Sequence, residues 1–266
     1  MIKRLTALSL AAVLAASAAI AECSDAGGVQ IYPTADVLPE NLLRIYVYFP
    51  HAMDLGQGIE MIQLLDASGD PVEQAFLSNR EDLWSPDRRR LTLLLDPGRV
   101  KTRLDAHEEL GRALVPGQSF AFEVSGDALT ADGCPLGDDT RHAFQVTAAD
   151  FEPPEPSDWL LSPTQAMTTD PLEVTLGSPH DHLSLAFRLR VLDMSGAIVP
   201  GSIALGDDEA SWRFTPDAAW QPERYTLTID ERLEDLAGNR PGLLFDRPLD
   251  QAPLPWESAI DFTPQQ

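Results

Sequence analysis

The sequence predicts an all-β protein made of two tandem β-sandwich domains. Three observations support this prediction: short apolar runs between turn residues, a proline-rich segment near the middle of the chain, and a second half that repeats the pattern of the first. The chain has 266 residues, of which 44% are hydrophobic, so it is long enough and apolar enough for two packed domains.

Short apolar runs alternate with segments rich in Gly, Pro, Asp and Ser. They lie at 42–49, 60–65, 91–95, 119–124 and 142–146 in the first half, and at 172–176, 183–191, 211–215 and 225–229 in the second. Runs of this length between turn residues are typical of sandwich strands.

The run Glu152-Pro153-Pro154-Glu155-Pro156-Ser157 has no apolar periodicity, and its prolines predict a stiff linker. We therefore expect domains at 22–150 and 158–250, a linker at 151–157 that few contacts cross, and a flexible tail at 251–266.

The two halves share four segments in the same order. Residues 63–69 match 190–196, residues 92–97 match 211–216, and residues 119–124 match 224–229. The fourth match is a turn glycine, Gly133 or Gly238, which follows Phe120 or Tyr225 by thirteen residues. The matching intervals differ at one place, where the first half carries about thirteen extra residues centred on 98–111. Their apolar spacing predicts a short helical insertion.

The second half also resembles a known family. Its Trp212-Arg213-Phe214-Thr215-Pro216 run, its Tyr225-Thr226-Leu227-Thr228-Ile229 run and its Asp235-Leu236-Ala237-Gly238-Asn239 turn are similar to the bacterial Ig-like domain of surface and secreted proteins. The resemblance covers 183–245 well and 42–146 less closely. It implies two tandem Ig-like sandwiches with a spacer, adhesion or binding role, and it brings no catalytic residues.

The N-terminus has the layout of a secretory signal peptide at 1–21. Lys3 and Arg4 precede an apolar stretch at 5–20, and Ala19-Ile20-Ala21 places small residues before the expected cleavage point. The stretch is shorter than the roughly 20 residues of a membrane span. No later segment is apolar enough to span a bilayer, so we expect no integral span in the mature chain. We predict an exported protein of the periplasm or the extracellular space.

Charge and cysteine content agree with export. A net charge of −23 repels nucleic acid and anionic lipid. The two cysteines, Cys23 and Cys134, predict one disulfide in an oxidising compartment.

A search for chemistry finds no sequence motif for a nucleophile, a zinc protease, a phosphate loop or a redox pair. His180-Asp181-His182 is interpreted as a surface loop rather than a metal site, and acidic clusters such as Asp207-Asp208-Glu209 as solvated turns. We expect no cofactor and no metal.

The favoured function is a non-enzymatic binding or structural module of the cell envelope. The alternatives are a hydrolase whose site assembles only in three dimensions, and a periplasmic protein that binds calcium or copper, the latter from the faint pattern of His51 and Met53.

Basic residues concentrate at 80–112 against an acidic background. Internal ion pairing is one interpretation, and an anionic partner is the other. We predict that an envelope protein or a glycan binds the insertion together with the neighbouring arginines. The candidate residues are Arg88, Arg89, Arg90, Arg99, Lys101 and Arg103.

Overall fold

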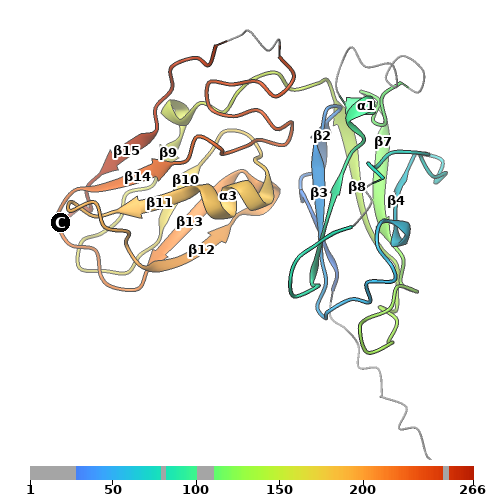
Figure 1. The fold of residues 1–266 in the computed structure, drawn as a ribbon. Coiled ribbons are helices and arrows are strands. Elements are labelled where there is room, and N and C mark those ends of the chain that lie inside the picture. Colours follow the sequence, from blue (N-terminus) through green and yellow to red (C-terminus); the bar gives the residue numbers. More distant parts are fainter. Residues whose placement is uncertain (1–27, 79–81, 101–110, 248–251) are drawn as a thin grey trace, which may run out of the picture.

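A computed structural model describes residues 28–78, 82–100, 111–247 and 252–266. The predicted signal peptide, Cys23, Lys101 and Arg103 lie outside the described residues. The prediction of an all-β fold is confirmed, because the described chain is built mainly of strands arranged in several sheets (Figure 1).

Each half of the chain contributes its own set of strands. Those of the first half are β1 (Gln30–Tyr32), β2 (Val37–Pro39), β3 (Arg44–Tyr48), β4 (Ile62–Leu65), β5 (Leu83–Trp84), β6 (Arg90–Leu94), β7 (Ser119–Val124) and β8 (Thr140–Thr147). Those of the second half are β9 (Leu160–Leu161), β10 (Leu172–Thr175), β11 (Leu189–Leu192), β12 (Gly201–Leu205), β13 (Ser211–Pro216), β14 (Tyr225–Ile229) and β15 (Ala259–Phe262). The helical elements are α1 (Pro97–Val100), α3 (His182–Arg188) and the short 3₁₀ turns η1 (Ile59–Met61), η2 (Pro156–Asp158) and η3 (Asp207–Glu209).

The sheets of the two halves have equivalent strand orders. One sheet of the first half runs β1-β3-β6-β5, and its counterpart in the second runs β9-β10-β13-β12. The other sheet runs β2-β8-β7-β4 in the first half and β15-β14-β11 in the second. Strand β2 pairs with β8 in parallel, and the second half keeps a single parallel bridge, Gln165 to Gln265, at the matching place. The sequence repeat therefore corresponds to a repeated topology.

In the central strands, apolar side chains face a core between the two sheets, and in several of them every second residue does so. In β6, Leu91 and Leu93 are buried while their neighbours are half-buried, and β14 alternates in the same way. The first core contains residues of both sheets of its half, and the second is centred on the fully buried Trp212 and Trp220.

A matching turn follows β4 and β11. The Asp66 carboxylate accepts the N–H groups of Ser68 and Asp70, and Asp193 accepts those of Ser195 and Ala197 in the same way. The glycine of each turn has a positive φ, 85° at Gly69 and 82° at Gly196, which a residue with a Cβ adopts only at a cost.

Two expectations about secondary structure were wrong. The run 183–191 is not one strand, because Asp181 caps a helix by accepting the N–H of Ser184, and α3 occupies 182–188 before β11 begins. The tail 251–266 is not loosely attached, because β15 pairs with β14 over four residue pairs, Tyr225–Phe262 to Thr228–Ala259. Of the predicted helical insertion, the described residues contain only the four residues of α1 and the chain from Gly111 onward.

Candidate functional site at the junction of the two halves

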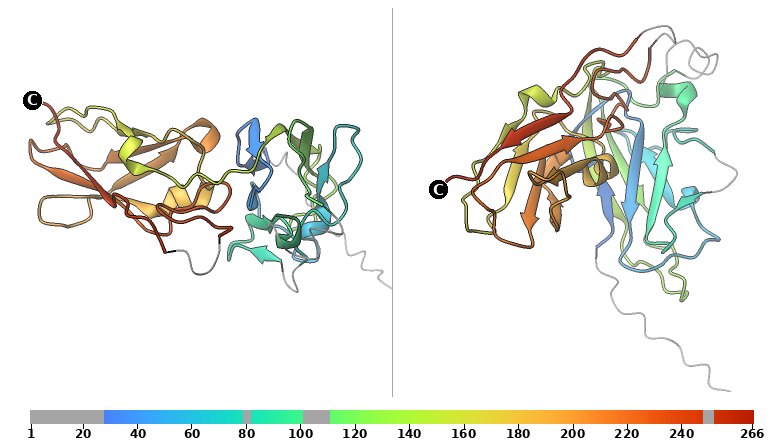
Figure 2. Two further views of the ribbon diagram at one scale, coloured as in Figure 1. Left: turned by 90° about the horizontal axis from the view of Figure 1, so that it is seen from above. Right: turned by 60° about the vertical axis from the view of Figure 1, so that its left-hand side comes forward.

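The two halves meet along β3, α3 and the loop that follows β14 (Figures 1 and 2). The Leu43 N–H donates to the Leu236 carbonyl at 2.9 Å, and the Leu236 side chain belongs to the core of the first half. The Asn239 amide donates to the carbonyl of Asp150, just before the linker, at 3.2 Å. The expectation that few contacts join the halves was therefore wrong.

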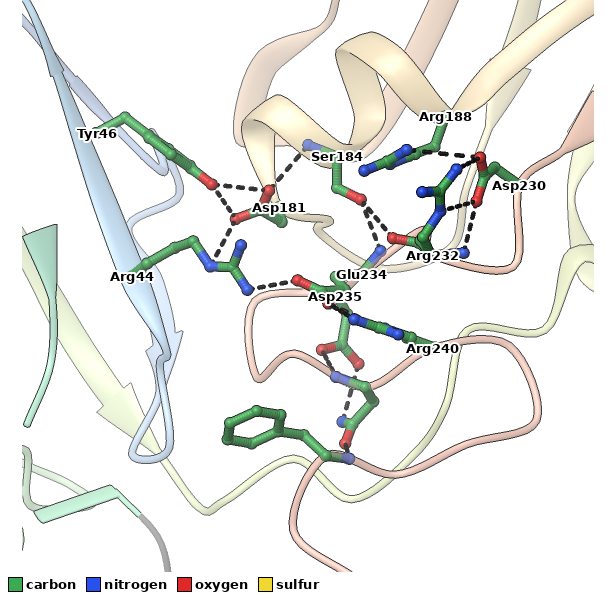
Figure 3. A network of polar contacts seen from close by, with 12 residues as sticks. Arg44, Tyr46, Asp181, Ser184, Arg188, Asp230, Arg232, Glu234, Asp235 and Arg240 are labelled. Carbon is green, nitrogen blue, oxygen red and sulfur yellow. Dashed lines mark hydrogen bonds and ion pairs between the residues drawn. The ribbon is translucent and has the colours of Figure 1, made fainter. Parts of the chain in front are cut away.

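A charged network crosses this junction. Arg44 and Tyr46 lie two residues apart on β3, so both side chains leave the same face of the sheet and point toward α3 (Figure 3). The Tyr46 hydroxyl donates to Asp181 Oδ2 at 2.8 Å. Arg44 Nε lies 3.6 Å from the same oxygen, and Arg44 Nη2 pairs with Glu234.

Burial shapes the protonation of this network. Burial raises the pKa of Asp181, and the Arg44 guanidinium opposes that rise. Burial and then the Asp181 charge raise the pKa of the Tyr46 hydroxyl, which therefore stays protonated and donates.

A second group of ion pairs extends the network over the surface of the second half. Glu234 also accepts from Arg240 at 2.6 Å, so one carboxylate joins arginines from both halves. Asp230 accepts from Arg232 at 2.9 Å and lies 3.5 Å from Arg188 at the end of α3. The four arginines and Glu234 line a cavity of about 340 Å³ together with Leu183 and Phe187.

A second cavity of about 580 Å³ lies on the other side of Phe187. Its wall includes Tyr32, whose ring contacts His182 in a tilted arrangement with centroids 3.7 Å apart. Glu209 is buried beneath it, and its carboxylate accepts the Thr34 N–H at 2.9 Å. Asp208 and Glu209 both have positive φ, so the backbone is strained where this carboxylate reaches the first half.

The interpretation of His180-Asp181-His182 as a surface loop was wrong. His180 is completely buried, its Nδ1 lies 2.9 Å from the Ser178 carbonyl, and burial lowers its pKa to about 4. His182 begins α3 and is half-buried against Tyr32. Among the described residues, no group of three or more His, Cys, Asp or Glu side chains is arranged to hold a metal ion.

The two residues of the predicted copper pattern, His51 and Met53, lie in different environments. Met53 is fully buried in the first core, whereas His51 is exposed on the preceding loop. The Met53 thioether therefore serves packing.

The structure divides the candidate partner-binding arginines into two places. Arg88, Arg89 and Arg90 lie at the turn between β5 and β6, and Arg99 lies in α1 beyond the opposite end of β6. The four steps of β6 alone separate these places by roughly 13 Å. A partner surface that includes both places stays a prediction.

Arg99 is also not available to a partner. It is buried, and its guanidinium donates to the carbonyls of Glu73, Gly111 and Arg112, which closes the base of the insertion. Lys101 and Arg103 lie outside the described residues, so their role stays a prediction.

The junction residues were not predicted from the sequence. One signal was present: Arg44 is a charged residue inside the apolar run 42–49, and such a residue needs a partner when it is buried. Nothing in the sequence identifies Asp181 and Glu234 as the partners.

Comparisons with known proteins add little to this geometry. No protein-family model and no curated protein matches the chain. Among solved structures, CopC from Methylosinus trichosporium OB3b is similar with a TM-score of 0.29 and 18% identity, covering 46% of this chain and 93% of that one. Domains MG0-NIE-MG1 of native alpha-2-macroglobulin from Escherichia coli give 0.27 and 10%, covering 90% and 70%. The titin Ig tandem A164-A165 gives 0.23 and 10%, covering 86% and 89%. Similarities with TM-scores this low carry no argument about function.

Proposed function

We propose that this chain is a non-enzymatic exported module in which two Ig-like sandwiches are held in one fixed orientation, so that the junction between them forms a binding surface. The main support for the proposal is that the Arg44 guanidinium of the first half pairs with two carboxylates of the second half, Asp181 and Glu234. Ion pairs between the two halves hold them in one relative orientation.

The alternative of a hydrolase is less well supported by the junction. The Ser184 hydroxyl donates to the Arg232 carbonyl and accepts the Glu234 N–H, so its oxygen is committed to the backbone. The Tyr46 hydroxyl has a raised pKa, and His180 is buried beneath the surface. A nucleophile needs an adjacent base and an approach for substrate, and these groups lack that combination.

Export and the partner belong to the same proposal. No helix among the described residues is long and apolar enough to cross a membrane. The acidic charge disfavours nucleic acid, and an envelope protein or a glycan stays the expected partner. The Cys23–Cys134 disulfide stays a prediction, because Cys23 lies outside the described residues.

The fixed orientation can be tested with spin labels in equivalent turns. Ala67 and Met194 are exposed at matching positions after β4 and β11, so labels there report the distance between the halves. We expect a narrow distance distribution in the wild type. Arg44→Met should broaden it, because this change leaves Glu234 without its partner from the first half and leaves Asp181 with Tyr46 alone.

Arg213→Met is the matched control. Arg213 pairs with Glu173 within one sheet of the second half, and both side chains are about half exposed. Its loss should leave the label distance unchanged, since exposed pairs contribute only about 0–1 kcal/mol. A broad distribution in the wild type would overturn the proposal of a rigid module.

A further inference from the structure

The cavity beside α3 has an unusual charge for this protein. Four arginines, Arg44, Arg188, Arg232 and Arg240, line it with two carboxylates, Asp181 and Glu234. With Asp230 included, which pairs with Arg188 and Arg232, the cluster carries a net charge of about +1 when all groups are ionised. The whole chain carries −23, so this is a local positive site on an acidic molecule.

The guanidinium groups retain unused donors. Each arginine has five N–H donors. Within the described residues, the Arg188 side chain makes a single bond of 3.5 Å to Asp230. Arg44 donates to Glu234, and its Nε is buried and lacks a hydrogen-bond partner. Arg232 and Arg240 each use two nitrogens on one carboxylate. Three carboxylates, Asp181, Glu234 and Asp230, therefore pair with four arginines, and N–H donors remain for another acceptor.

These donors are accessible. The side chains of Arg188, Arg232 and Arg240 are 33%, 57% and 40% exposed, whereas the Asp181 carboxylate is buried. An incoming group meets the guanidinium groups first. The planar guanidinium matches a carboxylate, which can accept two parallel N–H bonds.

An apolar wall stands beside the arginines. Phe187 is 59% exposed, although it lies in a helix, and it lines the cavity with the half-buried Leu183. An exposed aromatic ring next to convergent polar groups is typical of a small-molecule site. The cavity volume of about 340 Å³ suits a ligand of modest size.

We propose that the cavity lined by Arg188, Arg232 and Arg240 binds a small organic carboxylate whose apolar or aromatic body lies against Phe187. This site extends the proposed function and rests on it in one respect: the fixed junction is needed to place Arg44 in the cavity. The three more exposed arginines all belong to the second half.

The test is a titration with 3-phenylpropionate, followed by calorimetry and by amide chemical shifts. Binding should saturate and should shift amides of α3 and of residues 230–240. Acetate, which lacks the body, should bind more weakly, and 3-phenylpropan-1-ol, which lacks the charge, should not bind. Added salt should weaken the binding.

Arg188→Gln should weaken binding by roughly 10- to 100-fold, the effect of losing charge-assisted hydrogen bonds. Arg232→Gln is the second variant, in case the first disturbs α3, and melting temperature monitors the fold of both. Arg213→Gln, on the outer face of another sheet, is the control and should bind as the wild type does.

Three results would overturn the proposal: no saturable binding of 3-phenylpropionate, unchanged affinity in both folded arginine variants, or inorganic phosphate binding as tightly as the carboxylate. The label distance between Ala67 and Met194, measured in Arg188→Gln, keeps the two proposals apart. A narrow distribution with no carboxylate binding would overturn the ligand site and leave the rigid module intact.

Discussion

Gly238 gives a quantitative test of the junction. It has a φ of +79°, and a Cβ added there would lie 2.6 Å from Leu43 Cδ2 in the other half and 3.3 Å from the Phe245 ring. Gly133 holds the equivalent turn position in the first half, with a φ of +80°, and a Cβ added there would meet nothing within 4 Å. Comparing alanine substitutions at Gly133 and Gly238 therefore separates the free-energy cost of the backbone conformation from that of the contact with the other half.

The expected magnitudes follow from these two environments. A left-handed non-glycine residue costs about 1–2 kcal/mol, and we expect this for Gly133→Ala. Gly238→Ala should carry the same cost plus about 1–3 kcal/mol for the contact with Leu43, because Leu43 is itself buried and has little room to move. The total for Gly238→Ala is therefore about 2–5 kcal/mol.

Chemical denaturation of both variants gives the free energies of unfolding. A double variant with Leu43→Ala should recover part of the loss caused by Gly238→Ala, because it removes the methyl group that the new Cβ meets. Equal losses in Gly133→Ala and Gly238→Ala, with no coupling to Leu43, would refute the packing of the two halves against each other.

Three further predictions test other parts of the structure. His180 has a pKa of about 4 when folded and about 6.5 when unfolded, so its contribution to stability is present above pH 6.5 and is lost as the pH falls toward 4, by about 3 kcal/mol in all. Burial raises the pKa of Asp235 to about 7, so Asp235 lowers the stability as the pH rises, which is opposite to the effect of His180. The His180 contribution is therefore measured as the difference in unfolding free energy between the wild type and His180→Asn at each pH. Thiol labelling of denatured, unreduced protein should detect no thiol if Cys23 and Cys134 are joined, and two reactive thiols would contradict the disulfide. Because the disulfide would close a long loop, it should stabilise the fold by about 4–5 kcal/mol. A fragment of residues 158–266 should melt cooperatively, whereas 158–250 should not, because the shorter fragment lacks β15, whose Phe262 stacks on Tyr225 with centroids 5.6 Å apart; equal melting of both fragments would show that β15 is dispensable.

The sequence by itself determined the features that depend on neighbouring residues. Residues 63–69 and 190–196 were matched from the sequence, and each ends in a turn whose glycine, Gly69 or Gly196, tolerates a positive φ. The structure adds that Asp66 and Asp193 bond to the backbone two and four residues on. Most strands were predicted from short apolar runs between turn residues, although the run 183–191 contains α3 before β11. These signals are local, so they can be read without knowing the fold.

The same local reading failed where a distant contact decides the outcome. Strand β15 was missed because it is short and follows a proline-rich segment, and its pairing partner β14 lies about thirty residues earlier. Arg99 was interpreted as a surface cation because it sits in a charged stretch. The carbonyls of Glu73, Gly111 and Arg112 bury it instead.

Only the tertiary structure decided the junction. Tyr46 and Asp181 are 135 residues apart in the chain, and Arg44 and Glu234 are 190 apart. A buried charge predicts that some partner exists, because an unpaired charge is costly away from water. Which of the chain's 42 acidic residues becomes that partner depends on how the two sandwiches pack, and that packing leaves no periodic pattern in the sequence.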